Sequence, residues 1–415
     1  MTAPSPPRSR LREAIAGLPR PFWFLWGGVL VTRCGAFVLP FLALYLTQGL
    51  RLSPARAGLV VSLYGAGGAV AAPLGGWLAD HVGRRVVMVA ALGLGGAGMI
   101  ALGFAHRITV LAPALFLVAL VSESYRPAMQ AAVSDLVAPG DRVRAFGFIY
   151  WVINLGVSFG LTVGGLIATH SFTWLFIGDG ATTMAFAALI AFGVPETRPD
   201  RVRAADGTRA GGHGGFWAPY LDRTFLAFLL LSFLIALVFM QNATTFAVDM
   251  VAHGLSRADF GRVLAVNGVL IVLVQPFLAP VLAGRNRSRT LAAGAVLLGL
   301  GFGLNAVAHT IATYAGSVVV WTMGEMMVLP VANAVVADLA PVATRGRYQG
   351  AYGLSFALAV CVAPAIGMAA LGRFGPVGLW SGCLVIGLVV AAGQLALGRT
   401  LTAARRARAV PDAAH

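Results

Sequence analysis

The fold of this chain is decided by the stretch Gly76-Trp77-Leu78-Ala79-Asp80-His81-Val82-Gly83-Arg84-Arg85. Gly76 allows a neighbouring helix to approach closely, and Gly83 permits a tight turn. Asp80 can cap a helix N-terminus, or it can pair with Arg142 or Arg144 of a later basic loop. The charges follow directly after a long apolar run, which is typical of a helix that ends at the surface of a membrane.

The composition outside this stretch excludes an ordinary soluble protein. Hydrophobic residues make up 58% of the 415 residues, charged residues only 11%, and the mean hydropathy is +0.83. A soluble protein carries about a quarter charged residues, so the solvent of this chain is lipid. The three cysteines lie inside apolar segments and match no metal spacing. We therefore expect neither a metal nor a cofactor.

Long apolar segments predict the topology, because a helix needs about 20 apolar residues to cross the hydrocarbon core. Twelve segments qualify: 21–47, 56–79, 86–105, 109–136, 145–169, 172–193, 224–250, 258–283, 289–308, 311–338, 347–372 and 376–398. We predict an all-α integral membrane protein of twelve transmembrane helices. The polar linker 194–223 separates a six-helix half at 21–193 from another at 224–398, with end segments at 1–20 and 399–415.

The arginines predict the orientation. All 30 basic residues are arginines, and with both termini inside, 22 fall in inner segments and 6 in outer loops. This asymmetry follows the positive-inside rule, so we predict a multi-pass protein of the cell membrane with both termini in the cytoplasm. Since the arginines are spread over short loops and not gathered on one face, we expect no nucleic-acid partner.

The two halves repeat each other at an offset of 203 residues. The stretch 127–147 matches 330–350 in a proline, an aspartate, two arginines and a glycine. A repeat of two six-helix halves is a transporter architecture in which the substrate path runs between the halves. A channel, a sensor or a membrane enzyme needs no such duplication. No nucleophile elbow or phosphate loop is present, so we do not predict an enzyme.

Residues 76–85 resemble the loop signature of the major facilitator superfamily, glycine-x-leucine-alanine-aspartate-x-x-glycine-arginine-arginine/lysine, at every defining position. The resemblance implies the twelve-helix major facilitator fold and alternating access. It also implies a charge cluster that latches the halves in the outward-open state. The predicted gating residues are Gly76, Asp80, Gly83, Arg84, Arg85, Asp135, Arg142, Arg144 and Asp338. In the second half Ala283 stands where Asp80 would repeat, so the second latch should be weaker.

The fifth span carries Gly156-x-x-x-Gly160-Leu161-x-x-Gly164-Gly165. This pattern is similar to the antiporter signature of the drug-efflux branch of the superfamily, although Leu161 stands where that signature has proline. The resemblance implies export. The alternative is that these small residues serve only for helix packing.

Four charged side chains are predicted near the middle of the membrane. Glu123 and Arg126 are one turn apart on one helix face, and Arg33 and Glu325 lie at similar depth. Charges at this depth are costly and functional by default, so we predict Glu123 and Glu325 as proton carriers or substrate ligands. Arg126 and Arg33 would hold or release Glu123. The alternative is a static Glu123–Arg126 bridge that fixes helix register.

Three amide side chains extend the predicted path: Asn154 in the fifth span, and Gln241 and Asn242 in the seventh. The alternative for each is a hydrogen bond between helices. The leading hypothesis is a monomeric, proton-driven exporter of amphipathic small molecules or drugs, of the kind that gives multidrug resistance. Its partners are the substrate, protons and the lipid bilayer.

The second hypothesis keeps the fold and changes the substrate. Arg33 and Arg126 would clamp an organic anion or a peptide. The stretch 32–47 resembles the first span of proton-coupled peptide carriers. Those carriers have glutamates just before the arginine, and residues 27–32 contain none, which counts against peptide uptake.

Overall fold

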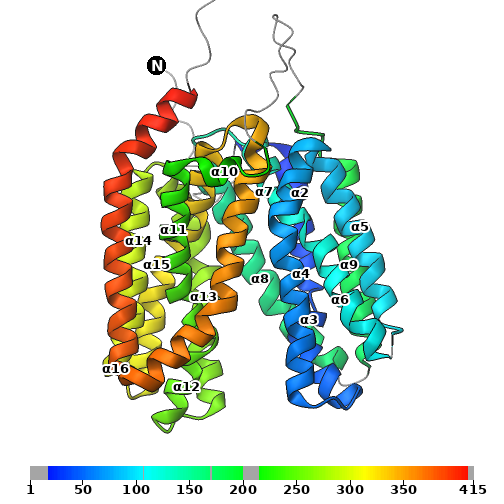
Figure 1. Ribbon diagram of the computed structural model, residues 1–415, viewed down its shortest axis with the longest axis vertical. Helices are drawn as coiled ribbons and strands as arrows, with labels where there is room; N and C mark the ends of the chain where they lie inside the picture. The colour runs from blue at the N-terminus through cyan, green and yellow to red at the C-terminus, as the bar shows by residue number, and fades with distance from the viewer. Residues whose placement is uncertain (1–16, 106, 169–170, 200–214, 410–415) are drawn as a thin grey trace, which may run out of the picture.

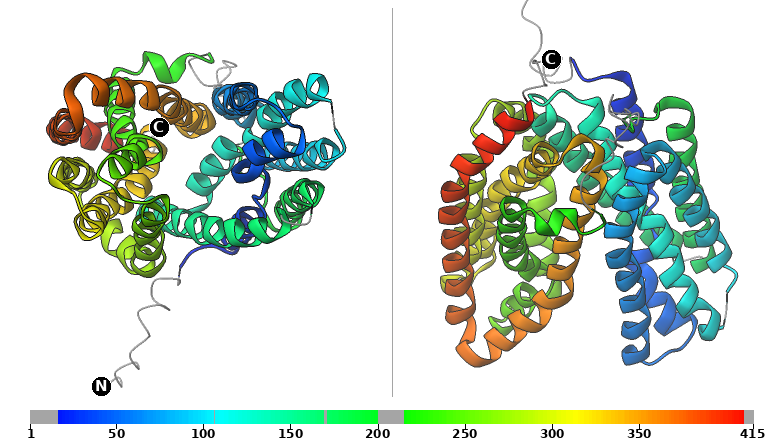
Figure 2. Two further views of the ribbon diagram at one scale, coloured as in Figure 1. Left: turned by 90° about the horizontal axis from the view of Figure 1, so that it is seen from below. Right: turned by 45° about the horizontal axis from the view of Figure 1, so that its top comes forward.

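The computed structural model describes residues 17–105, 107–168, 171–199 and 215–409, and within these residues every regular element is helical (Figure 1). The predicted linker 194–223 and end segments 1–20 and 399–415 lie partly outside the described residues. The helices form two bundles, one from α2 to α9 and the other from α11 to α16, and each bundle keeps its own outline when seen from below (Figure 2).

The first bundle contains α2 (Arg20–Cys34), α3 (Val38–Leu44), a π-helical turn (Tyr45–Gly49), α4 (Pro54–His81), α5 (Arg84–Leu102), α6 (Ile108–Glu123), α7 (Tyr125–Leu136), α8 (Arg142–Ala168) and α9 (Phe172–Gly193). The short α10 (Ala218–Leu221) leads into the second. That bundle contains α11 (Arg223–Phe239), a 3-10 turn (Met240–Ala243), α12 (Thr245–Ala252), α13 (Arg257–Ala283), α14 (Arg287–Leu304), α15 (Ile311–Leu339) and α16 (Arg345–Ala409).

The last helix, α16, makes two passes. Its backbone is non-helical at Gly375, where φ is 70°, a left-handed conformation that glycine adopts at no steric cost. The chain turns back at this point, as the orange and red parts of α16 show in Figure 1. Eleven stretches of the described residues are long and apolar enough to span a membrane, and the last of them, Val342–Gly398, holds both passes. The predicted twelve-pass, all-α fold is confirmed.

Three spans that the sequence predicts as continuous are broken in the structure. The first is broken between Cys34 and Val38, where the Asp179 carboxylate accepts a hydrogen bond from the Val38 N–H at 3.1 Å and so caps α3. The fourth is broken at Ser124, one turn before Pro127, which has no N–H to donate to the preceding turn.

The seventh span is broken at the 3-10 turn Met240–Ala243. The Gln241 amide satisfies the freed backbone there: its Nε2 donates to the carbonyls of Leu237 at 3.0 Å and Ala363 at 3.2 Å. Its Oε1 accepts from the Thr245 hydroxyl at 2.8 Å. Hydropathy cannot show such breaks, because a broken helix whose freed groups find partners inside the protein is as apolar as a continuous one.

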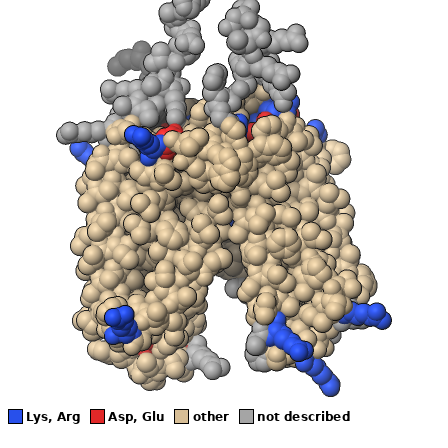
Figure 3. Space-filling model, viewed as in Figure 1, with Lys and Arg blue, Asp and Glu red and all other residues tan. Residues whose placement is uncertain are grey.

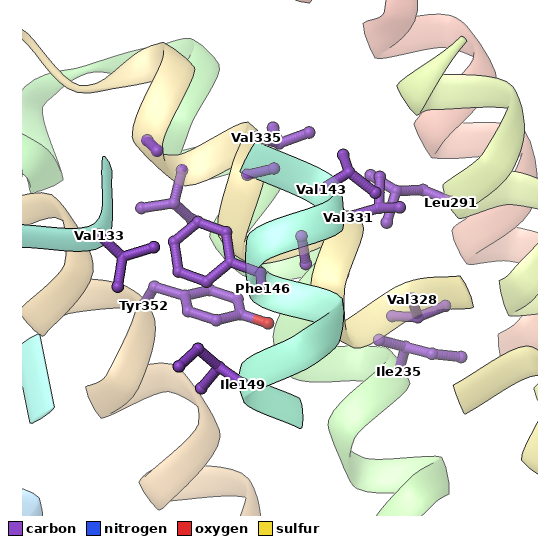
Figure 4. Packing of buried hydrophobic residues seen from close by; sticks show 14 of the residues in the cluster. Val133, Val143, Phe146, Ile149, Ile235, Leu291, Val328, Val331, Val335 and Tyr352 are labelled. Atoms are coloured by element: carbon purple, nitrogen blue, oxygen red, sulfur yellow. The ribbon is translucent and has the colours of Figure 1, made fainter. Parts of the chain in front are cut away.

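The two bundles meet at one end of the molecule and diverge at the other, where the space-filling view shows a deep hollow between them (Figure 3). We call these the closed end, which carries Asp80, Asp135 and Asp338, and the open end, which carries α3 and α12. Buried apolar side chains of both halves pack together toward the closed end, among them Phe146 of α8 and Tyr352 of α16 (Figure 4). Coloured charges in Figure 3 lie at the two ends and not in the tan belt between them, as expected of a multi-pass membrane protein.

Candidate functional site

Ion pairs at the closed end tie the halves together through two equivalent aspartates. Asp135, at the end of α7, forms an ion pair with Arg84 of its own half, with Nε and Oδ2 3.2 Å apart. Its other oxygen, Oδ1, accepts from Arg345 at the start of α16, in the second half. The α7 carboxylate is therefore shared between both halves of the molecule.

Asp338, at the end of α15, repeats this arrangement with the halves exchanged. Its Oδ2 accepts from Arg287 of its own half, and its Oδ1 accepts from Arg142 of the first half at 2.7 Å. Arg142 also donates to the Ser134 carbonyl at 2.8 Å. The 203-residue repeat thus brings each predicted gating aspartate to one arginine from either half.

A third contact across the halves has no counterpart in the repeat. The buried Asp80 carboxylate accepts from the backbone N–H groups of Gly346 and Arg347, both at 2.9 Å, and from Arg347 Nε at 3.2 Å. It therefore caps the N-terminus of α16, where the helix dipole favours an anion. Of the two alternatives for Asp80, the helix cap is therefore the one observed. Pairing with Arg142 or Arg144 is not, because Arg142 binds Asp338 and Arg144 pairs with Asp141, just before α8, at 3.3 Å.

Glycines bring the backbones of α4 and α16 into contact beside this cap. A Cβ on Gly76 would lie 2.2 Å from the Gly346 carbonyl oxygen, so no larger residue fits without separating the halves. Gly83 has a φ of 130°, and the Glu196 carboxylate packs against it. That carboxylate accepts from the N–H groups of Arg84 at 2.8 Å and Arg85 at 3.1 Å and so caps α5.

The predicted gating residues therefore fall into two groups, those that contact the other half and those that do not. Five of them contact the other half directly: Asp80, Asp135, Arg142, Asp338 and Gly76. Arg84 also contacts it, through a 3.1 Å hydrogen bond to the Val342 carbonyl. Gly83, Arg85 and Arg144 hold elements of the first half. The predicted gating set omits Glu196, which holds α5 from the connection after α9.

These buried pairs suit a gate. Charged groups that leave water lose several kcal/mol of hydration each, about as much as their mutual attraction returns. Breaking the contact between the halves would return these groups to water and recover that hydration. The ion pairs therefore fix how the two halves meet at the closed end, but they add little to the free energy needed to separate them.

At mid-depth in the second half lies the carboxylate of Glu325, on α15, with 4% of the residue exposed. Its Oε2 accepts from Asn267 Nδ2 of α13 at 2.7 Å, and Asn267 also donates to the Thr322 hydroxyl at 3.0 Å. The buried hydroxyl of Tyr150, on α8 of the first half, faces the same carboxylate. Within the described residues no arginine or histidine pairs with Glu325, so only a proton or an entering cation would neutralise it.

The equivalent depth in the first half is different. Glu123 and Arg126 form the predicted ion pair, with Arg126 Nη2 donating to Glu123 Oε1 at 3.1 Å. Arg126 is half-exposed. Arg33 donates to the Tyr125 hydroxyl at 3.5 Å and forms no ion pair with any described residue. The first half thus has a neutralised carboxylate and one cation without a carboxylate partner.

The structure changes the interpretation of the three amides. Gln241 uses both N–H groups and its oxygen to hold the break in the seventh span, so we remove it from the predicted coupling set. Asn242 donates to the Phe239 carbonyl at 2.6 Å and belongs to the same turn. Asn154 donates to the Tyr150 carbonyl at 3.0 Å, one turn from the hydroxyl that faces Glu325, and remains a candidate.

Glu325 also borders an apolar cavity inside the second half. The walls come from α11, α14, α15 and α16, and the aromatic and polar members of the lining are Phe228, Ser232, Phe239, Tyr352, Phe356 and Gln394. The Gln394 oxygen is buried without a hydrogen bond from any described residue. The cavity therefore offers a mostly apolar surface with a carboxylate and an amide oxygen at its edge.

Known proteins resemble this chain along its whole length. A family model described as Major Facilitator Superfamily matches residues 25–364 and 228–414. The uncharacterized MFS-type transporter YttB of Bacillus subtilis (strain 168) is 27% identical over 395 residues, 94% of this chain and 98% of that protein. The Na(+), Li(+), K(+)/H(+) antiporter of Planococcus maritimus is 24% identical over 356 residues, 79% of this chain and 84% of its own. The structure of the human organic anion transporter MFSD10 (TETRAN) aligns with a TM-score of 0.72 at 18% identity, covering 90% of this chain and 99% of that one.

Proposed function

The chain belongs to the major facilitator superfamily, and from this premise we propose that it exports amphipathic small molecules in exchange for protons. The observation that carries the proposal is Glu325, a buried carboxylate that accepts a hydrogen bond from the uncharged Asn267 and faces the Tyr150 hydroxyl of the other half. A carboxylate in this setting changes its net charge when it binds a proton. It can therefore couple proton binding to the packing of one half against the other.

The proposal places the closed end and both termini in the cytoplasm, because the inner segments carry most of the arginines. The described state then opens outward. A proton from outside neutralises Glu325, the substrate leaves, and the closed end separates as the ion pairs of Asp135 and Asp338 exchange protein partners for water. On the inside the proton is lost and a new substrate binds. One monomer suffices for this cycle.

The proposed substrate class follows from the kinds of side chain around Glu325, and not from the size of the cavity there, which is small in this state. Aromatic and aliphatic walls bind apolar surface, and the carboxylate favours a cationic or proton-donating group. Drug-like lipophilic amines have both features. The Planococcus maritimus relative is named for exchange of metal cations against protons, which supports cation–proton exchange as the mechanism but would suit a much smaller and more polar substrate.

The test uses proteoliposomes with an imposed pH gradient and a pH indicator in the lumen. Lipophilic amines should trigger proton movement in the wild type, and Glu325→Gln should abolish it. The matched control is Asp259→Asn, which removes a carboxylate that pairs with Arg262 at the start of α13 and should transport normally. Undiminished proton movement in Glu325→Gln would contradict the proposal. If alkali cations alone triggered proton movement, the proposed substrate class would be wrong and the exchange of a cation for protons would stand.

A second candidate function is supported by Arg33, which has no ion-pair partner among the described residues. A cation of this kind beside the path suits an organic anion, and Arg126 would join it once Glu123 released it. Proton movement triggered only by organic anions, and lost in Arg33→Gln, would favour this carrier. Anion-driven movement that persists in both Arg33→Gln and Arg126→Gln would exclude it.

A further inference from the structure

A second buried carboxylate lies at the open end of the second half, far from the sites described above. Asp249, on α12, has a side chain with 0% exposure. Its Oδ2 accepts from the Tyr314 hydroxyl of α15 at 2.7 Å and from Trp380 Nε1 of α16 at 3.1 Å. Two neutral donors on one oxygen suit an ionised acceptor. This carboxylate therefore joins three helices at the end of the molecule where the halves are apart.

The other oxygen of Asp249 faces a histidine. Oδ1 makes no hydrogen bond with any described residue, and the nearest cationic group is His253 Nδ1 at 3.7 Å. The same Nδ1 lies 2.9 Å from the Asp249 carbonyl and 3.0 Å from the Tyr314 hydroxyl. Since acceptors surround Nδ1, the ring carries a hydrogen there, and a proton from solution would be taken up at Nε2.

Two features of the fold surround the ring of His253. The residue is the C-cap of α12, where the helix dipole attracts a positive charge. The ring also lies beside a buried anion that no described arginine neutralises. A quarter of the side chain is exposed, so water reaches the ring while Asp249 stays buried. Histidine is the side chain whose charge normally changes between pH 5 and 8.

We propose that His253 and Asp249 form a proton-binding site at the open end, separate from Glu325. Tyr314 and Glu325 both lie on α15, eleven residues apart, which is about 16 Å along a helix. Protonated His253 places a positive charge beside the Asp249 carboxylate and so supports the cluster in which Asp249 joins α12 to α15 and α16. This stabilisation is present at acidic pH and is lost as the ring loses its proton.

The other charged groups near this site have partners of their own. Asp259 and Arg262 of α13 pair with each other at 3.2 Å, and Arg373 of α16 stacks on Phe374. The ring of His309, in the connection before α15, lies 4.7 Å from that of His253. It is the one neighbour among the described residues whose own protonation would oppose that of His253, so it is the control in the test.

The first test follows the histidine rings by NMR in the purified full chain, labelled with ¹⁵N in imidazole. The His253 signal is assigned by its loss in His253→Gln. We expect its proton affinity to fall about tenfold in Asp249→Asn, because removal of one neighbouring charge typically shifts such an equilibrium by about one pH unit. An unchanged titration of His253 in Asp249→Asn would overturn the proposal.

A second test does not require the buried aspartate to be changed. The measured quantity is the thermal unfolding midpoint at pH 5.5 minus that at pH 8. This difference should be larger in the wild type than in His253→Gln. In His309→Gln it should be as large as in the wild type or larger. Equal pH dependence in wild type and His253→Gln would overturn the proposal. Both tests are made without substrate, and Glu325→Gln should keep both signals, so their failure is distinguishable from failure of the proposed transport cycle.

Discussion

The two halves share one arrangement of aspartate and arginine at the closed end and carry different charges at mid-depth. Asp135 and Asp338 each bind one arginine from either half. At mid-depth, Glu123 is neutralised by Arg126, whereas Glu325 has only uncharged partners among the described residues. A gate in which each half closes on the other needs matching chemistry on both sides. Coupling needs only one carboxylate that is free to change its charge, and we propose Glu325 of the second half for this role.

The largest effect is expected when the symmetric part of the gate is broken. Asp338→Asn leaves two buried arginines without their carboxylate, and removing one partner of a buried ion pair costs about 3–5 kcal/mol. The closed end should therefore open more than about 100-fold more often. The measurement is the thiol-labelling rate of a cysteine placed at Val335, which is buried between the halves at this end, in a chain whose three native cysteines are replaced by serine.

Asp135→Asn is the matched variant for this prediction. Asp135→Asn should accelerate labelling to a similar or smaller extent, because Arg84 keeps a second carboxylate, Asp80, at 3.3 Å. Labelling that is unchanged in both variants would show that the ion pairs do not hold the closed end. A large effect in one variant alone would show that the gate is not symmetric.

A smaller effect is expected from the close approach of α4 and α16. Gly76→Ala places a methyl group against the Gly346 carbonyl, and overpacking of this kind costs about 1–3 kcal/mol. Labelling at Val335 should accelerate about 10-fold. Gly93→Ala is the control, because a Cβ at Gly93 would meet nothing within 4 Å. Equal rates in Gly76→Ala and Gly93→Ala would refute the claim that this glycine sets the distance between the halves.

Much of this gate was predictable from the sequence, because its residues repeat at one offset and stand at the ends of apolar runs. Asp135 and Asp338 could be assigned to it from position alone. Their individual partners could not, since pairing across the halves depends on how two separate bundles meet. For Asp80 the sequence left open a helix cap or a pairing with Arg142 or Arg144, and only the fold shows that it caps the start of α16.

The polar residues within the spans were less predictable for a different reason. Gln241 was predicted for the substrate path, but its bonds hold a helix break that hydropathy cannot detect. Asp249 gave no signal at all, because one aspartate near the end of an apolar span is commonly a residue at the membrane surface. Its importance depends on Tyr314 and Trp380, which are distant in sequence and reach it only in the folded bundle.

The mid-depth difference predicts a modest effect of Glu123→Gln. The Glu123–Arg126 pair is partly exposed, with 47% of the Arg126 side chain accessible, and pairs of this kind are worth about 1 kcal/mol or less. Transport should slow by less than about 10-fold and stay proton-driven, in contrast to Glu325→Gln. The measurement is the initial rate of proton movement in the same proteoliposomes. Complete loss of proton movement in Glu123→Gln would make the first half the site of coupling.

The smallest effect tests the Asp80 contact, which the repeat lacks. Ala283 is equivalent to Asp80, and Arg144 is equivalent to Arg347, so Ala283→Asp should give Arg144 a partner in the second half. Arg144 already pairs with Asp141, and an added pair at a partly exposed position contributes at most about 1 kcal/mol. Labelling at Val335 should therefore slow by no more than about fivefold, and Arg144→Gln should cancel the slowing. Faster labelling in Ala283→Asp would mean that the new carboxylate meets no cation, and that the halves, although equivalent in sequence, do not meet symmetrically at this point.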